Sequence, residues 1–328
     1  MSNKYIDKKF LSSYNLGKLK KNVTLLGSSK NELLKQLVKS LNNRNIKNSL
    51  ELAIELHISG YFDNVLAKLT TFYFNEINLA QPSGIIYYSD FIQYYNDKYN
   101  FSFKKKNPLS CINDIKIRNF VCFFIPLCCL SNQRKIPKLI KIGNDDFDLK
   151  KKKKKLVSKN LNMVKRFISE EDPKDIIIPV SEIVNLFASN NIDREQQIIY
   201  WLSWIYEYEV KYHNKSLLVK FRKIKDIDDK YSRDFIWIIW NILIKNVNSE
   251  FSKIMKHLFK IFKNKFTKTS KKSKSNIIII AIFLCVNPIP KIKYPYTINN
   301  ETFKRCILES LKSNKYYHNM FTKVLLNH

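Results

Sequence analysis

The chain has 328 residues and a formal net charge of +30, with 58 Lys and Arg residues against 28 Asp and Glu residues. A hydrophobic content of 45% excludes a disordered basic tail, because such tails lack the apolar surface that offsets the entropy cost of ordering. Five glycines in the whole chain argue against Gly-rich phosphate loops and against β-architectures with a glycine at each tight turn. The length suffices for one or two folded domains with a sizeable core.

Helical periodicity dominates the first part of the chain. Ser29 and Glu32 have the spacing of a capping box, which predicts a helix start at residue 30. Apolar residues then recur every three or four positions over 33–41, and similar stripes follow over 46–57 and 63–79. Short connections between such amphipathic segments are typical of a helical array.

Two more helices are predicted before residue 130, one over 85–98 and a buried one over 112–129 that Pro126 bends or ends. The next segment contains six consecutive lysines, and such a block is normally solvated. Helical patterns resume after it. We therefore predict an all-α multi-helix array that allows for two helical subdomains, with at most a minor strand pair. The predicted organisation is a basic N-terminal segment (1–29), an N-terminal helical domain (30–130), a charged linker or loop (131–159) and a C-terminal helical domain (160–328).

Neither a membrane nor an oxidising compartment is indicated. The six cysteines include no Cys-x-x-Cys pair and no metal-like spacing. The start of the chain (MSNKYIDKKF) lacks the apolar core of a signal peptide, so we expect reduced thiols and an intracellular protein. The longest apolar run, residues 277–286, has ten residues where a membrane span needs about 20. The sequence thus predicts a soluble protein with no membrane span.

No catalytic motif is complete. Gly27 and Lys30 resemble part of a phosphate-binding loop, but the second glycine and the Ser or Thr after the lysine are missing. Two acidic groups are able to ligate a cation, Asp226 with Asp228 and Asp229, and Asp145 with Asp146 and Asp148. In both places helix capping or loop solvation is preferred, because acidic residues before a helix commonly complement its dipole. We therefore predict a non-enzymatic protein with no catalytic residues, no metal site and no cofactor.

Two tryptophan pairs at i, i+3 spacing stand out in the second half, Trp201 with Trp204 and Trp237 with Trp240. Aromatic faces of this kind stack nucleic-acid bases in some proteins. The isoleucines and leucines around both pairs favour the core instead, with the two helices packing Trp against Trp. We therefore predict buried tryptophans.

The excess of lysine has two possible origins. Fifty of the 58 basic residues are lysine, and the codons of lysine, asparagine and isoleucine are rich in A and T, so genome composition explains part of the count. This bias does not explain the shortage of acidic residues, whose codons tolerate A and T as well. A surplus of +30 attracts polyanions through salt-dependent, non-specific electrostatics.

The lysines are clustered. Residues 245–274 contain ten lysines and one glutamate, and within 253–266 the lysines follow i+3/i+4 spacing opposite an apolar stripe. A cationic ridge on an amphipathic helix suits a phosphate backbone, but a solvated face and a helix on an anionic membrane share this pattern. The candidate nucleic-acid-binding residues are Lys150, Lys151, Lys152, Lys153, Lys154, Lys155, Lys253, Lys256, Lys260, Lys263, Lys265, Lys268, Lys271, Lys272 and Lys274.

Residues 33–82 resemble the helical module that follows the AAA+ ATPase core in the replication-associated recombination and clamp-loader-like group. The resemblance rests on Lys39 and Ser40, on the polar break at 42–45 and on residues 76–82 (EINLAQP). The ATPase itself is absent, so the resemblance implies a helical scaffold that oligomerises and implies no activity.

Over most of its length the chain resembles uncharacterised proteins of nucleocytoplasmic large DNA viruses of the mimivirus-like group. The residues that carry the resemblance are 55–62 (ELHISGYF), 171–174 (EDPK), 200–205 (YWLSWI) and 229–231 (DKY) leading into 235–240 (FIWIIW). This resemblance implies a viral factory in the host cytoplasm or the virion interior as the location. It assigns no catalytic residues.

The leading hypothesis is a viral accessory protein that binds DNA or RNA non-specifically during replication, transcription or packaging. Other viral proteins are expected as further partners. The alternative is a virion-structural or protein-interaction scaffold without a specific nucleic-acid role, whose charge keeps it soluble or neutralises packaged DNA.

Overall fold

The computed structural model describes residues 22–99, 111–149, 156, 161–214, 217–286 and 301–326. Within these residues the secondary structure consists of thirteen α-helices and several short 3-10 or π turns. The extended pairing there is limited to two isolated bridges, Val23 with Ser29 and Leu218 with Asp234. The predicted all-α fold is confirmed.

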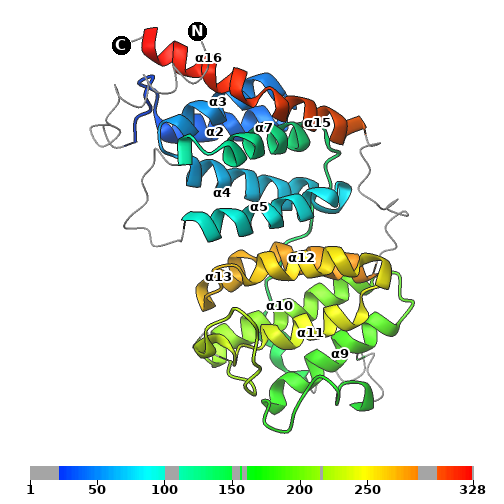
Figure 1. Ribbon diagram of the computed structural model, residues 1–328. Coiled ribbons are helices and arrows are strands. Elements are labelled where there is room, and N and C mark those ends of the chain that lie inside the picture. Colours follow the sequence, from blue (N-terminus) through cyan, green and yellow to red (C-terminus); the bar gives the residue numbers. More distant parts are fainter. Residues whose placement is uncertain are drawn as a thin grey trace. The chain divides into compact units, whose positions relative to one another are not determined.

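The chain forms two compact units (Figure 1). Unit 1 combines the described residues up to Lys135 with those after Lys293, and unit 2 spans 136–292. The helices of unit 1 are α2 (Lys30–Asn42), α3 (Ile46–Ile58), α4 (Phe62–Phe72), α5 (Ser83–Tyr99), α7 (Ile115–Leu130), α15 (Glu301–Leu311) and α16 (Ser313–Leu326), with a π turn η2 (Tyr73–Ile77) and a 3-10 turn η3 (Asn78–Ala80) between α4 and α5.

Helix α7 is the centre of unit 1. Nearly all of its residues from Ile117 to Cys129 are buried, so it presents apolar side chains all round and needs neighbours on every side. Asp114 caps its start by accepting hydrogen bonds from the backbone N–H groups of Lys116 (2.8 Å) and Ile117 (3.3 Å). The helix continues through Pro126 to Leu130, so the proline does not end it.

The C-terminal helices belong to unit 1, which corrects the predicted C-terminal domain of 160–328. Helices α15 and α16 pack on α7, and α16 also packs on α3. The Phe303 ring lies 4.9 Å from that of Phe123, and the Ser313 hydroxyl donates to Asn119 at 2.6 Å. The reason is the apolar circumference of α7, which α3, α4 and α5 cover only in part.

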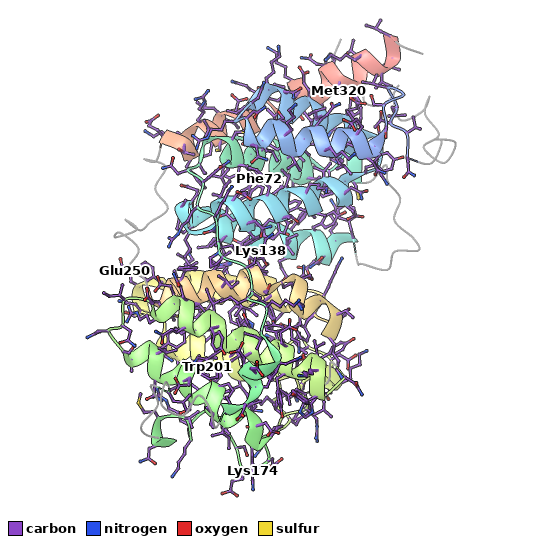
Figure 2. All side chains as sticks on the ribbon, turned by 180° about the vertical axis from the view of Figure 1, so that it is seen from behind. Phe72, Lys138, Lys174, Trp201, Glu250 and Met320 are labelled. Atoms are coloured by element: carbon purple, nitrogen blue, oxygen red, sulfur yellow. The ribbon has the colours of Figure 1, made fainter. Side chains whose placement is uncertain are left out.

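Unit 2 contains the remaining described helices, and Figure 2 shows Trp201 among its side chains. Helix α14 is apolar on all faces and contacts α10, α11 and α12. Among the described residues no helix combines the length and apolarity needed to cross a bilayer. The helices are α9 (Ile177–Ala188), α10 (Arg194–Tyr212), α11 (Ile236–Asn246), α12 (Ser252–Lys263), α13 (Lys268–Ser273) and α14 (Ser275–Val286), with 3-10 turns at Asn144–Phe147, Leu161–Met163, Lys174–Ile176, Asp229–Tyr231 and Ser249–Phe251.

A buried histidine connects α3 to α16 in unit 1. His57 Nδ1 lies 2.6 Å from the Tyr317 hydroxyl, and Nε2 lies 3.2 Å from the carbonyl oxygen of Cys111. Burial and the nearby Arg118 guanidinium lower the pKa of His57 from 6.5 to about 3. The folded unit therefore holds this imidazole neutral at every pH near neutrality.

We predict that unit 1 loses stability as the pH falls below 6.5. Unfolded His57 takes up a proton there while the folded imidazole stays neutral down to about pH 3, so protonation favours the unfolded chain. The loss is about 1.4 kcal/mol per pH unit, hence about 2 kcal/mol between pH 6.5 and 5. Urea unfolding followed by far-UV circular dichroism measures it, and His57→Gln removes this pH dependence.

Tryptophan fluorescence provides the reference for that measurement, because all four tryptophans lie in unit 2. The substitution at His57 is expected to leave the pH dependence of the fluorescence transition unchanged. If the stability measured by circular dichroism fell equally steeply with pH in the His57→Gln variant, the pH dependence would not be due to His57.

Candidate nucleic-acid interface

Helix α12 has one cationic and one apolar face. At 100° per residue, Lys253, Lys256, Lys260 and Lys263 fall on one narrow stripe, and the helix contains no acidic residue. The opposite face consists of buried side chains: Ile254, Met255, Leu258, Ile261 and Phe262. The predicted ridge therefore exists as a helical feature. We call its four lysines the α12 ridge.

Aromatic packing fixes the apolar face of α12. Trp240 on α11 lies 5.1 Å from the Phe259 ring and 5.2 Å from the Phe262 ring, measured between centroids. Trp237 lies 4.7 Å from the ring of Phe266, just after the helix. Such contacts hold α12 in one orientation about its own axis, which determines where its lysines point.

The prediction of buried tryptophans is confirmed, since all four side chains are at most 6% exposed. The expected packing of Trp against Trp between the two helices is not what the rings show. Trp237 and Trp240 contact the phenylalanines of α12 and the segment after it, whereas Trp204 stacks on Tyr208 of its own helix at 4.8 Å.

The ridge is not uniformly available to a ligand. Lys253 and Lys256 are exposed and Lys260 is half-buried. The fourth member, Lys263, retains only 13% side-chain exposure, because its ammonium donates to the carbonyl oxygen of Lys225 at 2.8 Å and pairs with Asp226 at 3.2 Å. The outward part of the ridge therefore consists of three lysines spread over about 10 Å of helix.

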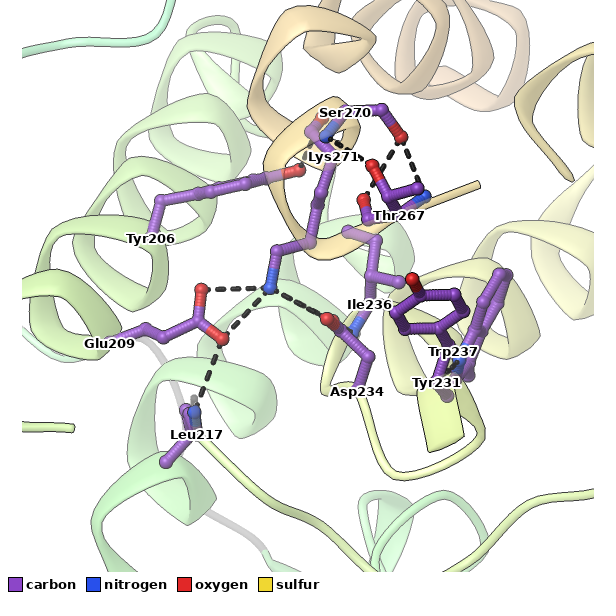
Figure 3. Close-up of polar contacts among 10 residues, drawn as sticks. All are labelled: Tyr206, Glu209, Leu217, Tyr231, Asp234, Ile236, Trp237, Thr267, Ser270 and Lys271. Carbon is purple, nitrogen blue, oxygen red and sulfur yellow. Dashed lines mark hydrogen bonds and ion pairs between the residues drawn. The ribbon is translucent and has the colours of Figure 1, made fainter. Parts of the chain in front are cut away.

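Lys271 lies in the core of unit 2, which corrects its prediction as a nucleic-acid-binding residue. Its ammonium donates to both oxygens of Glu209 (2.8 and 2.7 Å) and to both oxygens of Asp234 (3.0 and 2.9 Å), as Figure 3 shows. All three side chains are at most 5% exposed. We call Lys271, Glu209 and Asp234 the buried triad.

The buried triad has one positive and two negative charges, so other groups must solvate the second carboxylate. The backbone N–H of Leu217 donates to Glu209 Oε1 at 3.2 Å, and that of Ile236 donates to Asp234 Oδ1 at 3.0 Å. The ring of Phe235 lies 4.2 Å from the Lys271 ammonium and adds a cation–π contact. Every charge of the triad is thus hydrogen-bonded.

The remaining candidate lysines between residues 265 and 274 differ in exposure and in partners. Lys265 and Lys272 are exposed, Lys268 is half-buried, and Lys272 pairs with Glu207 at 3.0 Å. Lys274 donates to the carbonyl oxygens of Phe262 (3.0 Å) and Asn264 at the end of α12. Burial and the neighbouring Lys265 lower the pKa of Lys274 to about 8. Lys274 therefore caps a helix and directs its charge inward.

The first basic cluster, Lys150, Lys151, Lys152, Lys153, Lys154 and Lys155, lies outside the described residues. The described structure therefore brings together only the lysines between 253 and 274. Its outward members are Lys253, Lys256, Lys260, Lys265, Lys268 and Lys272.

Two of the acidic residues that the sequence offered as cation ligands, Asp226 and Asp228, have other partners. Asp228 caps the turn Asp229–Tyr231 by accepting from the Lys230 N–H, and Asp226 pairs with Lys263. Over the described ranges no three His, Cys, Asp or Glu side chains are grouped to hold a metal ion. Sequence reasoning missed Glu209 and Asp234, and the only available signal was the apolar and aromatic residues beside them.

Comparison of the chain with protein-family models, with curated proteins and with solved structures finds no match.

We predict that Lys271→Met destabilises unit 2 by about 3–5 kcal/mol, because it leaves two buried carboxylates without a cation. Urea unfolding followed by tryptophan fluorescence measures this loss. Lys272→Met removes the same charge from an exposed neighbour and is expected to cost at most about 1 kcal/mol.

A triple variant tests the electrostatic cause. Glu209→Gln and Asp234→Asn combined with Lys271→Met remove all three buried charges, so much of the lost stability is expected to return. Equal stability of Lys271→Met and Lys272→Met would contradict the buried triad.

Proposed function

We propose that this protein is a non-enzymatic accessory protein of a large DNA virus that binds nucleic acid through the outward lysines of α12 and the segment after it. The ligand is the phosphate backbone, so binding is non-specific and includes DNA and RNA. The viral factory in the host cytoplasm and the virion interior are the proposed locations. Replication, transcription or packaging is the proposed context, with other viral proteins as further partners.

The observation that carries this proposal is the α12 ridge. Lys253, Lys256 and Lys260 share one face of a helix that has no acidic residue and whose opposite face is held in the core. A fixed row of cations costs less entropy to engage than the same lysines on a flexible chain. Lysine ammonium groups act as point charges toward phosphate, which suits binding without base readout.

An anionic membrane surface fits α12 less well than a phosphate backbone does. A helix that lies in a membrane interface inserts its apolar face among the lipids. In α12 that face is used within unit 2, where Ile254, Leu258 and Phe262 have no exposed surface. Only the cationic face remains for a partner, and electrostatics without insertion is what phosphate-backbone binding needs.

We predict that replacing Lys253, Lys256 and Lys260 together by Gln weakens duplex DNA binding mainly at low salt. Each phosphate contact contributes about 0.9 to the slope of log K against log salt, so the slope falls in magnitude by about 2.7. When the salt concentration rises from 50 to 200 mM, the variant therefore loses about 40-fold less affinity than the unmodified chain does. Fluorescence anisotropy with a labelled duplex across a salt series measures it.

The matched control is the triple replacement of Lys165, Lys174 and Lys211 by Gln. These residues are exposed, lie in unit 2 outside the ridge, and reduce the net charge equally. The control is expected to shift the slope by less than the ridge variant does. Identical salt slopes for the two triple variants would show that the α12 ridge is not the binding surface.

The same titration separates the second candidate function. A chain that binds duplex and single strands weakly, with little dependence on salt, would fit a virion-structural or protein-interaction scaffold instead. The resemblance of residues 33–82 to an oligomerising helical module favours that reading, since such modules act through protein contacts.

A further inference from the structure

Unit 1 has a cavity of about 460 Å³ between α3, α15 and α16. Its size falls within the range of sites that hold small organic ligands. The three helices that line it belong to the same unit, and α16 packs on both of the others (Figure 1).

The floor of the cavity is apolar. Leu50 and Ile54 on α3 are one helical turn apart, so their side chains point to the same side, and both are at most 2% exposed. Met320 on α16 completes the floor at 5% exposure, with a flexible thioether that adapts to differently shaped ligands.

The rim of the cavity has an excess of cations. Lys47, Arg305 and Lys323 line it together with Glu51 and Glu309. Glu309 already accepts hydrogen bonds from Lys312 at 3.0 Å and from the Tyr316 hydroxyl. Burial raises the pKa of Glu309, but these two bonds, together with the positive charges of Lys312 and Arg305, outweigh it and lower the pKa overall. Its charge is thus engaged within the protein.

Arg305 is the member of the rim best suited to bind an anion. It is exposed, and in the part of the chain that the structure describes its guanidinium makes no hydrogen bond or ion pair, although its positive charge helps to lower the pKa of Glu309. A guanidinium presents its donors in a fixed fork that matches a carboxylate with two parallel hydrogen bonds. An apolar floor below such a fork is complementary to an amphipathic molecule.

We propose that this cavity binds an amphipathic organic carboxylate. The carboxylate group pairs with Arg305 at the rim, with Lys47 and Lys323 adding positive potential. The hydrocarbon part lies on Leu50, Ile54 and Met320. This proposal is independent of nucleic-acid binding, which uses unit 2.

Isothermal titration of the full chain with decanoate, at pH 7.5 and 150 mM salt, tests the proposal. We expect saturable binding of one equivalent, and at least tenfold weaker binding to Arg305→Gln, because a charge-assisted hydrogen-bonded pair is lost. Lys304→Gln removes a charge from the neighbouring position, which does not line the cavity, and is expected to leave the affinity unchanged. Decan-1-ol and butyrate probe the two halves of the ligand and are expected to bind at least tenfold more weakly than decanoate.

Several results would overturn the proposal. Binding of many equivalents, weakened equally by Arg305→Gln and Lys304→Gln, would show only the attraction of a chain of charge +30 for any anion. If decan-1-ol bound as tightly as decanoate, the carboxylate group would not be what the cavity recognises. If butyrate bound as tightly as decanoate, the apolar floor would not contribute to binding. Thermal melting serves as the folding control, and Arg305→Gln is expected to melt like the unmodified chain because the side chain is exposed.

Discussion

One ammonium group, that of Lys271, sits between two carboxylates in the core of unit 2, and the arrangement of that unit depends on it. Glu209 comes from α10, Asp234 precedes α11, and Lys271 comes from α13, so one charge cluster joins three segments. Removing Lys271 leaves two buried carboxylates without a cation, which costs far more than the cluster contributes relative to an apolar replacement. The geometry of the lysine-rich segment before α14 follows from this constraint.

Lysines of similar sequence context have different roles in this chain. Lys271 is enclosed by acids, Lys274 caps the end of α12, and Lys263 is tied to a neighbouring loop. Lys253 and Lys256 project outward. The neighbours of each lysine, and not its position in a basic run, decide whether its ammonium is buried or exposed.

The hydrophobic periodicity of the sequence predicted those features that depend on a single segment of the chain. The helical stripes, the start of α2 at Lys30, the buried tryptophans and the two faces of α12 all follow from spacing within one segment. Even there the details differ, since Ser29 makes no side-chain cap and the predicted capping box does not form. Local patterns report which face is apolar, and they do not report which segment covers it.

Long-range contacts could not be predicted in this way. Lys271 is 62 residues from Glu209, and nothing in a run of lysines distinguishes the one that is buried. The return of α15 and α16 to α7 is likewise set by the unmet apolar surface of α7, which the sequence of α15 alone does not reveal. The cavity lined by Leu50, Arg305 and Met320 exists only because of that return.

The discontinuity of unit 1 has a consequence for synthesis on the ribosome. Helix α7 ends at Leu130 and its covering helix α15 begins at Glu301, with the whole of unit 2 between them. At roughly 5–20 residues per second, the apolar side of α7 waits about 10–30 s for its partners, while unit 2 is continuous and completes first. The nascent chain therefore passes through a state that exposes phenylalanine and cysteine side chains of α7, which is the kind of surface that chaperones recognise.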